Sequence, residues 1–172
     1  MDIVTEILDN IINYSLFFYD DETVKKEQLE KYIMYIKKNI NNNFCNLYFE
    51  KNFSIFHIDD VITIEDYLYK IISSLSITNS IMISAIIYLE RLQIDINIFN
   101  IHKLLLISIL ISSKFVEDEN YKNKYWSRIG GISILTLNKL EALYLVKIKY
   151  NLFIYTSEFY DKFNKIFSYK NY

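Results

Sequence analysis

The stretch NIHKLLLISILISSKF, residues 100–115, is apolar on nearly every face when it is placed on a helix. Leucine and isoleucine fill most of its positions, and no proline or glycine interrupts it. A helix without a polar face must be surrounded by other elements, because apolar side chains gain free energy only when they leave water. The sequence therefore predicts a buried helix at the centre of an all-helical bundle.

Four more segments around this stretch repeat apolar residues at helical spacing. They cover residues 64–75, 79–93, 122–129 and a segment that starts after Ser133 or Thr136 and runs to about residue 150. Thr63 and Thr78 stand where N-cap residues are expected, since a threonine oxygen can accept from the first backbone amides of a helix. Gly130 and Gly131, the only glycines of the chain, are expected to end the segment 122–129.

The N-terminal part of the chain predicts two further helices. Residues 2–19 carry one apolar stripe, and a second helix follows Thr23 as its cap and runs to about Ile40. Residues 44–62 are aromatic but poorly periodic, and a last helical piece is expected over 157–167. We divide the chain into a two-helix N-terminal extension (1–43), a packed linker (44–62), the five-helix bundle (63–155) and a C-terminal helical segment (156–172).

The composition is that of a globular protein, with 52% hydrophobic and 23% charged residues among 172. The formal net charge of −2 argues against a nucleic-acid partner, because phosphate binding needs clustered positive charge. Cys45 is the only cysteine, which excludes an intramolecular disulfide and a multi-cysteine zinc site. A reduced, intracellular protein is therefore expected.

One stretch, residues 71–89, carries no charge and is nominally long enough to span a bilayer. It contains seven serine, threonine and asparagine side chains, most of them in the middle. We interpret that cluster as a polar loop between two buried helices, and we expect no membrane partner. The N-terminus has acidic residues rather than a basic region before an apolar stretch, so no secretory signal is expected.

Residues that could carry catalysis or bind a metal are sparse. His57 and His102, the only histidines, stand forty-five residues apart and match no metal-ligand spacing. The two glycines are adjacent, so no phosphate-cradling loop exists, and nothing around Cys45 favours a nucleophile over a packed thiol. We expect no enzyme activity, no cofactor, no metal and no small-molecule ligand.

Two charges occupy helix faces that are otherwise suited to burial. Lys114 lies at the end of the central stretch, on its apolar stripe, and Glu141 lies between Leu137 and Leu145 on the next long helix. Packing these helices together would pair the two charges and avoid the cost of an unpaired buried one. Periodicity alone favours a simpler interpretation, in which the helix dipole stabilises the lysine and the glutamate reaches water, and it also allows an ion pair that binds no partner.

The stretch from Asp66 to Phe159 resembles the cyclin box, in particular that of the single-box P/U-type (PHO-like) cyclins, and six motifs within and next to it carry the resemblance. They are ITIEDYLYKI from Ile62, IYLERL from Ile87, HKLLLISILISSKF from His102, YKNKYWSRIGGIS from Tyr121, LNKLEALYL from Leu137 and YNLFIYTSEFY from Tyr150. The third and fourth motifs are the most specific. The resemblance covers residues 53–165, about two-thirds of the chain, and it identifies 63–155 as the cyclin box.

The resemblance implies a cyclin fold and a regulatory role, in which a cyclin binds a cyclin-dependent protein kinase and switches it on. By motif position, Lys114 and Glu141 would form the central contact with the kinase. Phe115, Leu145 and Tyr150 would belong to the apolar ring around that contact, although ordinary core packing remains open for Leu145. The cyclin itself would contribute no catalytic group.

The resemblance also aligns Lys70 and Glu90 with positions that suggest an ion pair between the first two helices of the box, a solvated pair being the alternative. The Met-Arg-x-x-Leu motif that cell-cycle cyclins use to dock substrates is absent from the first helix, so that route is not expected. Transcription factors of the TFIIB type share the fold, but they carry two repeats and basic surfaces. The stronger competing function is a non-catalytic scaffold of cyclin fold that binds a non-kinase partner.

Overall fold

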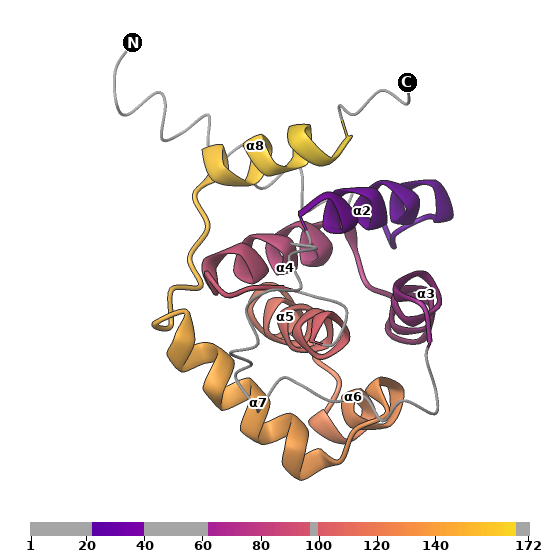
Figure 1. Cartoon of the computed structure of the whole chain (residues 1–172), viewed down its shortest axis with the longest axis vertical. Helices are drawn as coiled ribbons and strands as arrows, with labels where there is room; N and C mark the ends of the chain where they lie inside the picture. The colour runs from indigo at the N-terminus through magenta and orange to yellow at the C-terminus, as the bar shows by residue number, and fades with distance from the viewer. Residues whose placement is uncertain (1–21, 40–61, 97–99, 168–172) are drawn as a thin grey trace.

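The computed structural model describes residues 22–39, 62–96 and 100–167, and every regular element in these ranges is a helix (Figure 1). The helices are α2 (Lys26–Asn39), α3 (Ile64–Leu75), α4 (Asn79–Arg91), α5 (Ile101–Val116), α6 (Asn123–Gly130), α7 (Ile134–Lys147) and α8 (Thr156–Phe167). The β structure of the described residues is limited to an isolated antiparallel bridge between Thr23 and Thr78. The predicted all-α fold is confirmed, with α3 to α7 as the five helices of the bundle.

Helix α5 runs through the middle of the molecule, where α3, α4, α6 and α7 pack against it (Figure 1). Its residues from Ile101 to Ser113 are all buried except His102, which is half-buried. Each leucine or isoleucine buried in this way contributes about 1.5–3 kcal/mol. The Ser112 hydroxyl donates to the carbonyl oxygen of Ile81 on α4 at 2.8 Å, so this buried polar group has a partner. The predicted central helix is therefore confirmed.

The helix ends follow the capping residues that the sequence indicates. Thr63 and Thr78 each accept a hydrogen bond from the backbone amide three residues ahead. Ser133 accepts from the amide of Thr136, which decides between the two predicted starts of α7. Gly131 takes a φ of 68° and ends α6, because glycine adopts the left-handed conformation without steric cost.

Two helices of the bundle end earlier than the periodicity predicts. Helix α4 ends at Arg91 rather than residue 93, and α7 ends at Lys147 rather than about residue 150. The cause is local in both places, since Gln93, Lys149 and Tyr150 have φ values of 51°, 56° and 53°. A right-handed helix cannot continue through residues in the left-handed region.

The charge-free stretch 71–89 is divided between two helices, as predicted, because α3 ends at Leu75 and α4 starts at Asn79. Among the described residues, no single helix has both the length and the hydropathy needed to cross a bilayer. Helices α6 and α7 would meet that test together by length and composition, but they join at a bend of 103°.

Helix α2 packs against α3 and α8, so the described part of the N-terminal extension shares the core of the bundle. Its buried face consists of Leu29, Tyr32, Ile33 and Ile36. The helix starts at Lys26, so Thr23 is not its cap as predicted; Thr23 pairs with Thr78 instead. The predicted helix over 2–19 and residues 44–61 of the predicted linker lie outside the described residues.

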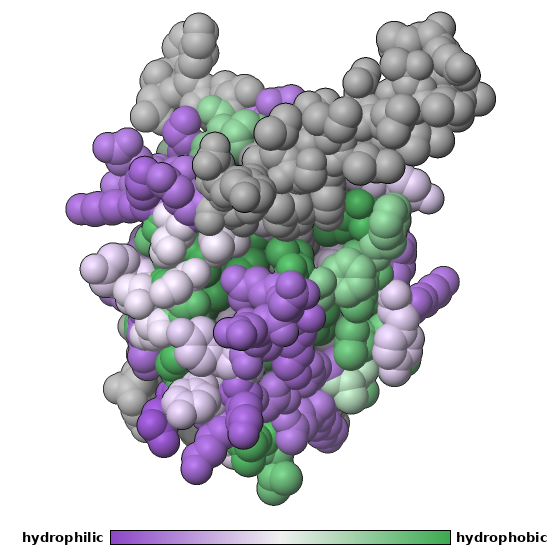
Figure 2. Space-filling view, turned by 180° about the vertical axis from the view of Figure 1, so that it is seen from behind, coloured by the Kyte–Doolittle hydropathy of each residue, from purple (hydrophilic) through white to green (hydrophobic). Residues whose placement is uncertain are grey.

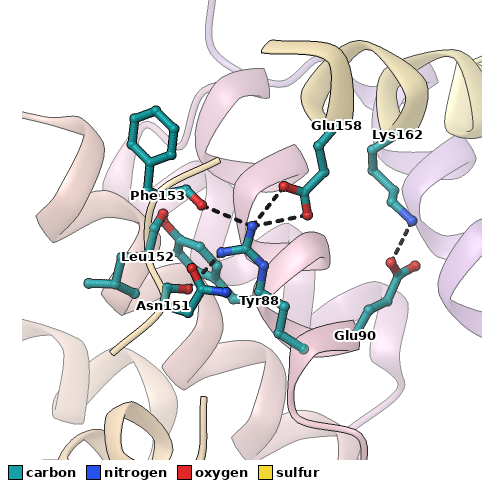
Figure 3. Close-up of polar contacts among 8 residues, drawn as sticks. Tyr88, Glu90, Asn151, Leu152, Phe153, Glu158 and Lys162 are labelled. Atoms are coloured by element: carbon teal, nitrogen blue, oxygen red, sulfur yellow. Dashed lines mark hydrogen bonds and ion pairs between the residues drawn. The ribbon is translucent and has the colours of Figure 1, made fainter. Parts of the chain in front are cut away.

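Two ion pairs fasten α8 to the end of α4 (Figure 3). Nη2 of Arg91 donates to both carboxylate oxygens of Glu158, at 3.0 and 2.7 Å. Nζ of Lys162 lies 2.5 Å from Oε2 of Glu90. The predicted bridge between Lys70 and Glu90 is therefore wrong. The end of α4 faces α8, so Glu90 meets Lys162, and Lys70 is exposed on α3.

Candidate partner-binding site

Lys114 and Glu141 meet at the surface of the bundle, at the end of α5 and the middle of α7. Nζ of Lys114 donates to Oε1 of Glu141 at 2.6 Å. The lysine side chain is 36% exposed and the glutamate side chain 15%. The pair thus lies at the rim of the core, and the structure brings together the two charges that the sequence singles out.

The packing of α7 on α5 does not depend on this pair. Leu137, Leu140 and Tyr144 of α7 are buried in the core, and apolar burial of that extent holds a helix in place. An ion pair with this exposure to water contributes only about 0.2–1 kcal/mol to folding. The pair is therefore a feature that the fold presents at its surface rather than one that the fold requires.

A third side chain, which the sequence analysis did not single out, completes the site. Asn123 is the first residue of α6, and its Nδ2 donates to Oε2 of Glu141 at 2.8 Å. The same nitrogen donates to Oδ1 of Asn138, also at 2.8 Å. Each oxygen of the Glu141 carboxylate thus accepts from a different helix. The only signal for Asn123 in the sequence was its place in the YKNKYWSRIGGIS motif.

Helix α6 reaches Glu141 because its far end lies directly on α5. A Cβ at Gly130 would come within 2.2 Å of a methyl carbon of Leu106, so a larger residue would have to displace that buried side chain. The hydroxyl of Tyr67 on α3 donates to the carbonyl oxygen of Gly130 at 3.2 Å. These contacts place α6, and with it Asn123.

The other predicted contact residues add apolar surface to the same two helices. Phe115 follows Lys114 and is 51% exposed, and Tyr150 lies beyond the end of α7 and is 65% exposed. Leu145, one turn after Glu141, is half-buried and packs against the core, so core packing accounts for part of its side chain. Seen from behind, hydrophobic surface borders hydrophilic surface on the side where α7 lies (Figure 2).

The described residues offer no grouping of three His, Cys, Asp or Glu side chains that would hold a metal ion. Nε2 of His102 lies 2.9 Å from the carbonyl oxygen of Ile62, and burial lowers the pKa of His102. This histidine therefore joins α5 to the residue that precedes the cap of α3. Cys45 and His57 lie outside the described residues.

The family model described as Cyclin matches residues 18–152, a range that includes α2 to α7. The match covers well over half of the chain, and the chain therefore belongs to the cyclin family. The match confirms the cyclin fold that the sequence motifs imply.

Curated relatives narrow the assignment. Cyclin-U4-1 of Arabidopsis thaliana is 34% identical over 67% of this chain and 59% of its own length. Cyclin-P4-1 of Oryza sativa subsp. japonica is 38% identical over 53% and 45%, and the PHO85 cyclin-like protein psl1 of Schizosaccharomyces pombe is 37% identical over 54% and 41%. The chain is a P/U-type cyclin, and it spans about half the length of the curated relatives it matches.

Proposed function

We propose that this cyclin binds a cyclin-dependent protein kinase through the Lys114–Glu141 pair and activates that kinase. The observation that carries the proposal is an ion pair at the rim of the core, next in sequence to the exposed Phe115, in a chain of the cyclin family. The name of one relative, the PHO85 cyclin-like protein psl1, supports a kinase as the partner.

The pair offers a donor and an acceptor side by side to a second protein. An ammonium group has three N–H bonds, so Lys114 can donate to carbonyl oxygens of the kinase while it still holds Glu141. Each carboxylate oxygen accepts more than one hydrogen bond, so Glu141 can accept from backbone amides of the kinase. Polar contacts of this kind set orientation and specificity, while exposed apolar side chains such as Phe115 and Tyr150 supply most of the affinity.

Activation follows if the cyclin binds one conformation of the kinase more tightly than the other. In active protein kinases a regulatory helix lies inward and brings its glutamate to the catalytic lysine. A partner that prefers this inward position shifts the kinase population toward it. ATP, magnesium and phosphoryl transfer then belong to the kinase, and the cyclin acts inside the cell as a regulatory subunit without catalytic groups.

The test is a titration of purified cyclin-dependent kinases, including a PHO85 kinase, with the wild-type chain, Lys114→Ala and Glu141→Ala. Each substitution should weaken binding by about 2–3 kcal/mol, because it leaves the other charge covered and unpaired in the complex. Lys139→Ala and Glu119→Ala remove exposed charges outside the pair and serve as matched controls with unchanged affinity. Thermal unfolding should differ little among all four variants.

Activation needs its own measurement. Addition of the wild-type chain should raise the rate at which the kinase phosphorylates a peptide, and both site variants should require more protein for the same rate. Unchanged affinity for both variants would remove Lys114 and Glu141 from the kinase contact. A chain that binds none of the kinases, yet co-purifies with another protein, would support the scaffold function instead.

A further inference from the structure

We infer that Asn123 is a positioning residue that orients the Glu141 carboxylate for the kinase, so that three helices rather than two build the contact. The inference rests on the proposed function and deepens it. It is carried by the hydrogen bonds that join α5, α6 and α7 at this carboxylate.

The contacts determine which way the Asn123 amide points. Its Nδ2 lies 2.8 Å from Oε2 of Glu141 and 2.8 Å from Oδ1 of Asn138. Both of these oxygens act as acceptors here, so the nitrogen and not the oxygen of the Asn123 amide must face them. The amide thus uses both of its hydrogens on α7, three residues apart along that helix. These two hydrogen bonds hold the Asn123 amide in one orientation, and the bond to Oε2 in turn fixes the orientation of the Glu141 carboxylate.

The carboxylate needs this second donor because the first one does not fix its plane. The terminal torsion of a glutamate is broad, so a carboxylate held at one oxygen can still rotate. Lys114 provides a point charge on a flexible stem and contacts Oε1 only. A donor at Oε2 from a separate helix removes the remaining freedom. Because the amide is neutral, it does so without disturbing the charge balance of the pair.

The position of Asn123 also depends on the packing at the other end of α6. Gly130 lies so close to Leu106 of α5 that an added Cβ would stand 2.2 Å from a leucine methyl, and Asn123 is at the opposite end of the same eight-residue helix. A shift of α6 away from α5 would therefore draw the Asn123 amide off Glu141. The close packing at Gly130 thus serves the partner-binding site as well as the core.

The decisive variant is Asn123→Asp, measured beside Asn123→Ala. An acidic residue in the first turn of a helix is favourable, so a residue that merely helps to start α6 would tolerate aspartate without loss. A residue that orients Glu141 would not, because two carboxylates in contact repel each other. At acid pH one shared proton lets the new carboxyl group donate as the amide does. The affinity of Asn123→Asp relative to wild type should therefore recover as the pH falls from about 7.5 to about 5.

Affinity for the partner kinase is the readout, with thermal unfolding recorded for each variant. Asn123→Ala should weaken binding about fivefold to tenfold, and Asn123→Asp should weaken it more at neutral pH and less at acid pH. Asn138→Ala leaves the Asn123–Glu141 hydrogen bond in place but removes the other acceptor of the Asn123 amide, so it should weaken binding less than Asn123→Ala does. Lys139→Ala removes an exposed side chain of the same helix and is the control that should change affinity less than about twofold.

The outcomes separate this inference from the proposed function. If Lys114→Ala and Glu141→Ala lose affinity while both Asn123 variants bind like wild type, the positioning role is wrong and the kinase contact stands. A loss for Asn123→Asp that does not change with pH would also overturn the positioning role. If Lys114→Ala and Glu141→Ala keep full affinity, the kinase contact lies elsewhere and the positioning role falls with it.

Discussion

Arg91 joins three parts of the chain, and its replacement by methionine makes a sharp test of the fold. Nη1 donates to the carbonyl oxygen of Asn151 at 2.6 Å, and Nη2 donates to that of Phe153 at 2.9 Å and to both oxygens of Glu158 (Figure 3). Arg91→Met keeps the apolar stem and removes every one of these donors. The segment between α7 and α8 then loses its polar attachment to α4.

The expected loss of stability in Arg91→Met depends on how exposed the interacting side chains are to water. The Arg91 side chain is 16% exposed and that of Glu158 is 37% exposed. Hydrogen bonds to a charged group contribute about 1.5–3 kcal/mol each, but Glu158 and the exposed Asn151 regain water when the guanidinium is removed. We therefore expect Arg91→Met to lower the free energy of unfolding by about 2–4 kcal/mol. Arg91→Lys should lower the free energy of unfolding by less, because lysine keeps the positive charge. It should still be less stable than wild type, because one ammonium group lacks the planar fork that reaches all of these acceptors.

Urea unfolding followed by circular dichroism gives the free energies, and a double-mutant cycle with Glu158→Gln isolates the ion pair. Hydrogen exchange should report faster opening of residues 148–155 in Arg91→Met, with α3 unchanged. A total loss below about 0.5 kcal/mol, the range of an ordinary surface substitution, would refute the reasoning. Packing of the buried Ile154 and Phe159 would then be sufficient to hold the segment.

Two further predictions concern the core and its dependence on pH. Gly130→Ala should cost about 1–3 kcal/mol by overpacking against Leu106, whereas Gly131→Ala should cost about 1–2 kcal/mol through its φ of 68°. In thermal unfolding, Leu106→Val should recover stability in Gly130→Ala but not in Gly131→Ala. Recovery in both variants would contradict these causes. Burial lowers the pKa of His102 from the ordinary 6.5, so the unfolded chain takes up the proton first and stability falls as the pH drops through that value. In urea unfolding, the stability of His102→Gln should fall less steeply with decreasing pH than that of wild type. An equally steep fall would exclude His102 as the source of the pH dependence.

Within the described residues, the sequence alone was sufficient to place the helices to within a few residues, and it indicated Lys114 and Glu141 but not Asn123. Helix positions and caps depend on neighbours in the chain, and the hydroxyl groups at Thr63, Thr78 and Ser133 cap helices in the structure. The buried helix 100–115 was evident because its leucines and isoleucines leave no polar face. The importance of Lys114 and Glu141 together followed from the resemblance to the cyclin box, because periodicity alone favoured a lysine stabilised by the helix dipole and a glutamate that reaches water.

Only the tertiary structure decided which polar side chains meet across helices. Glu90 was expected to pair with Lys70 and pairs with Lys162, because α8 and not α3 lies against the end of α4. The contact of Asn123 with Glu141 likewise depends on the depth to which Gly130 lets α6 settle on α5. Hydrophobic periodicity indicates that one face of a helix is buried. It does not indicate which other helix covers that face or how that helix is rotated about its own axis. A hydrogen bond over 2.8 Å is sensitive to both, so these partners follow from packing over the whole chain.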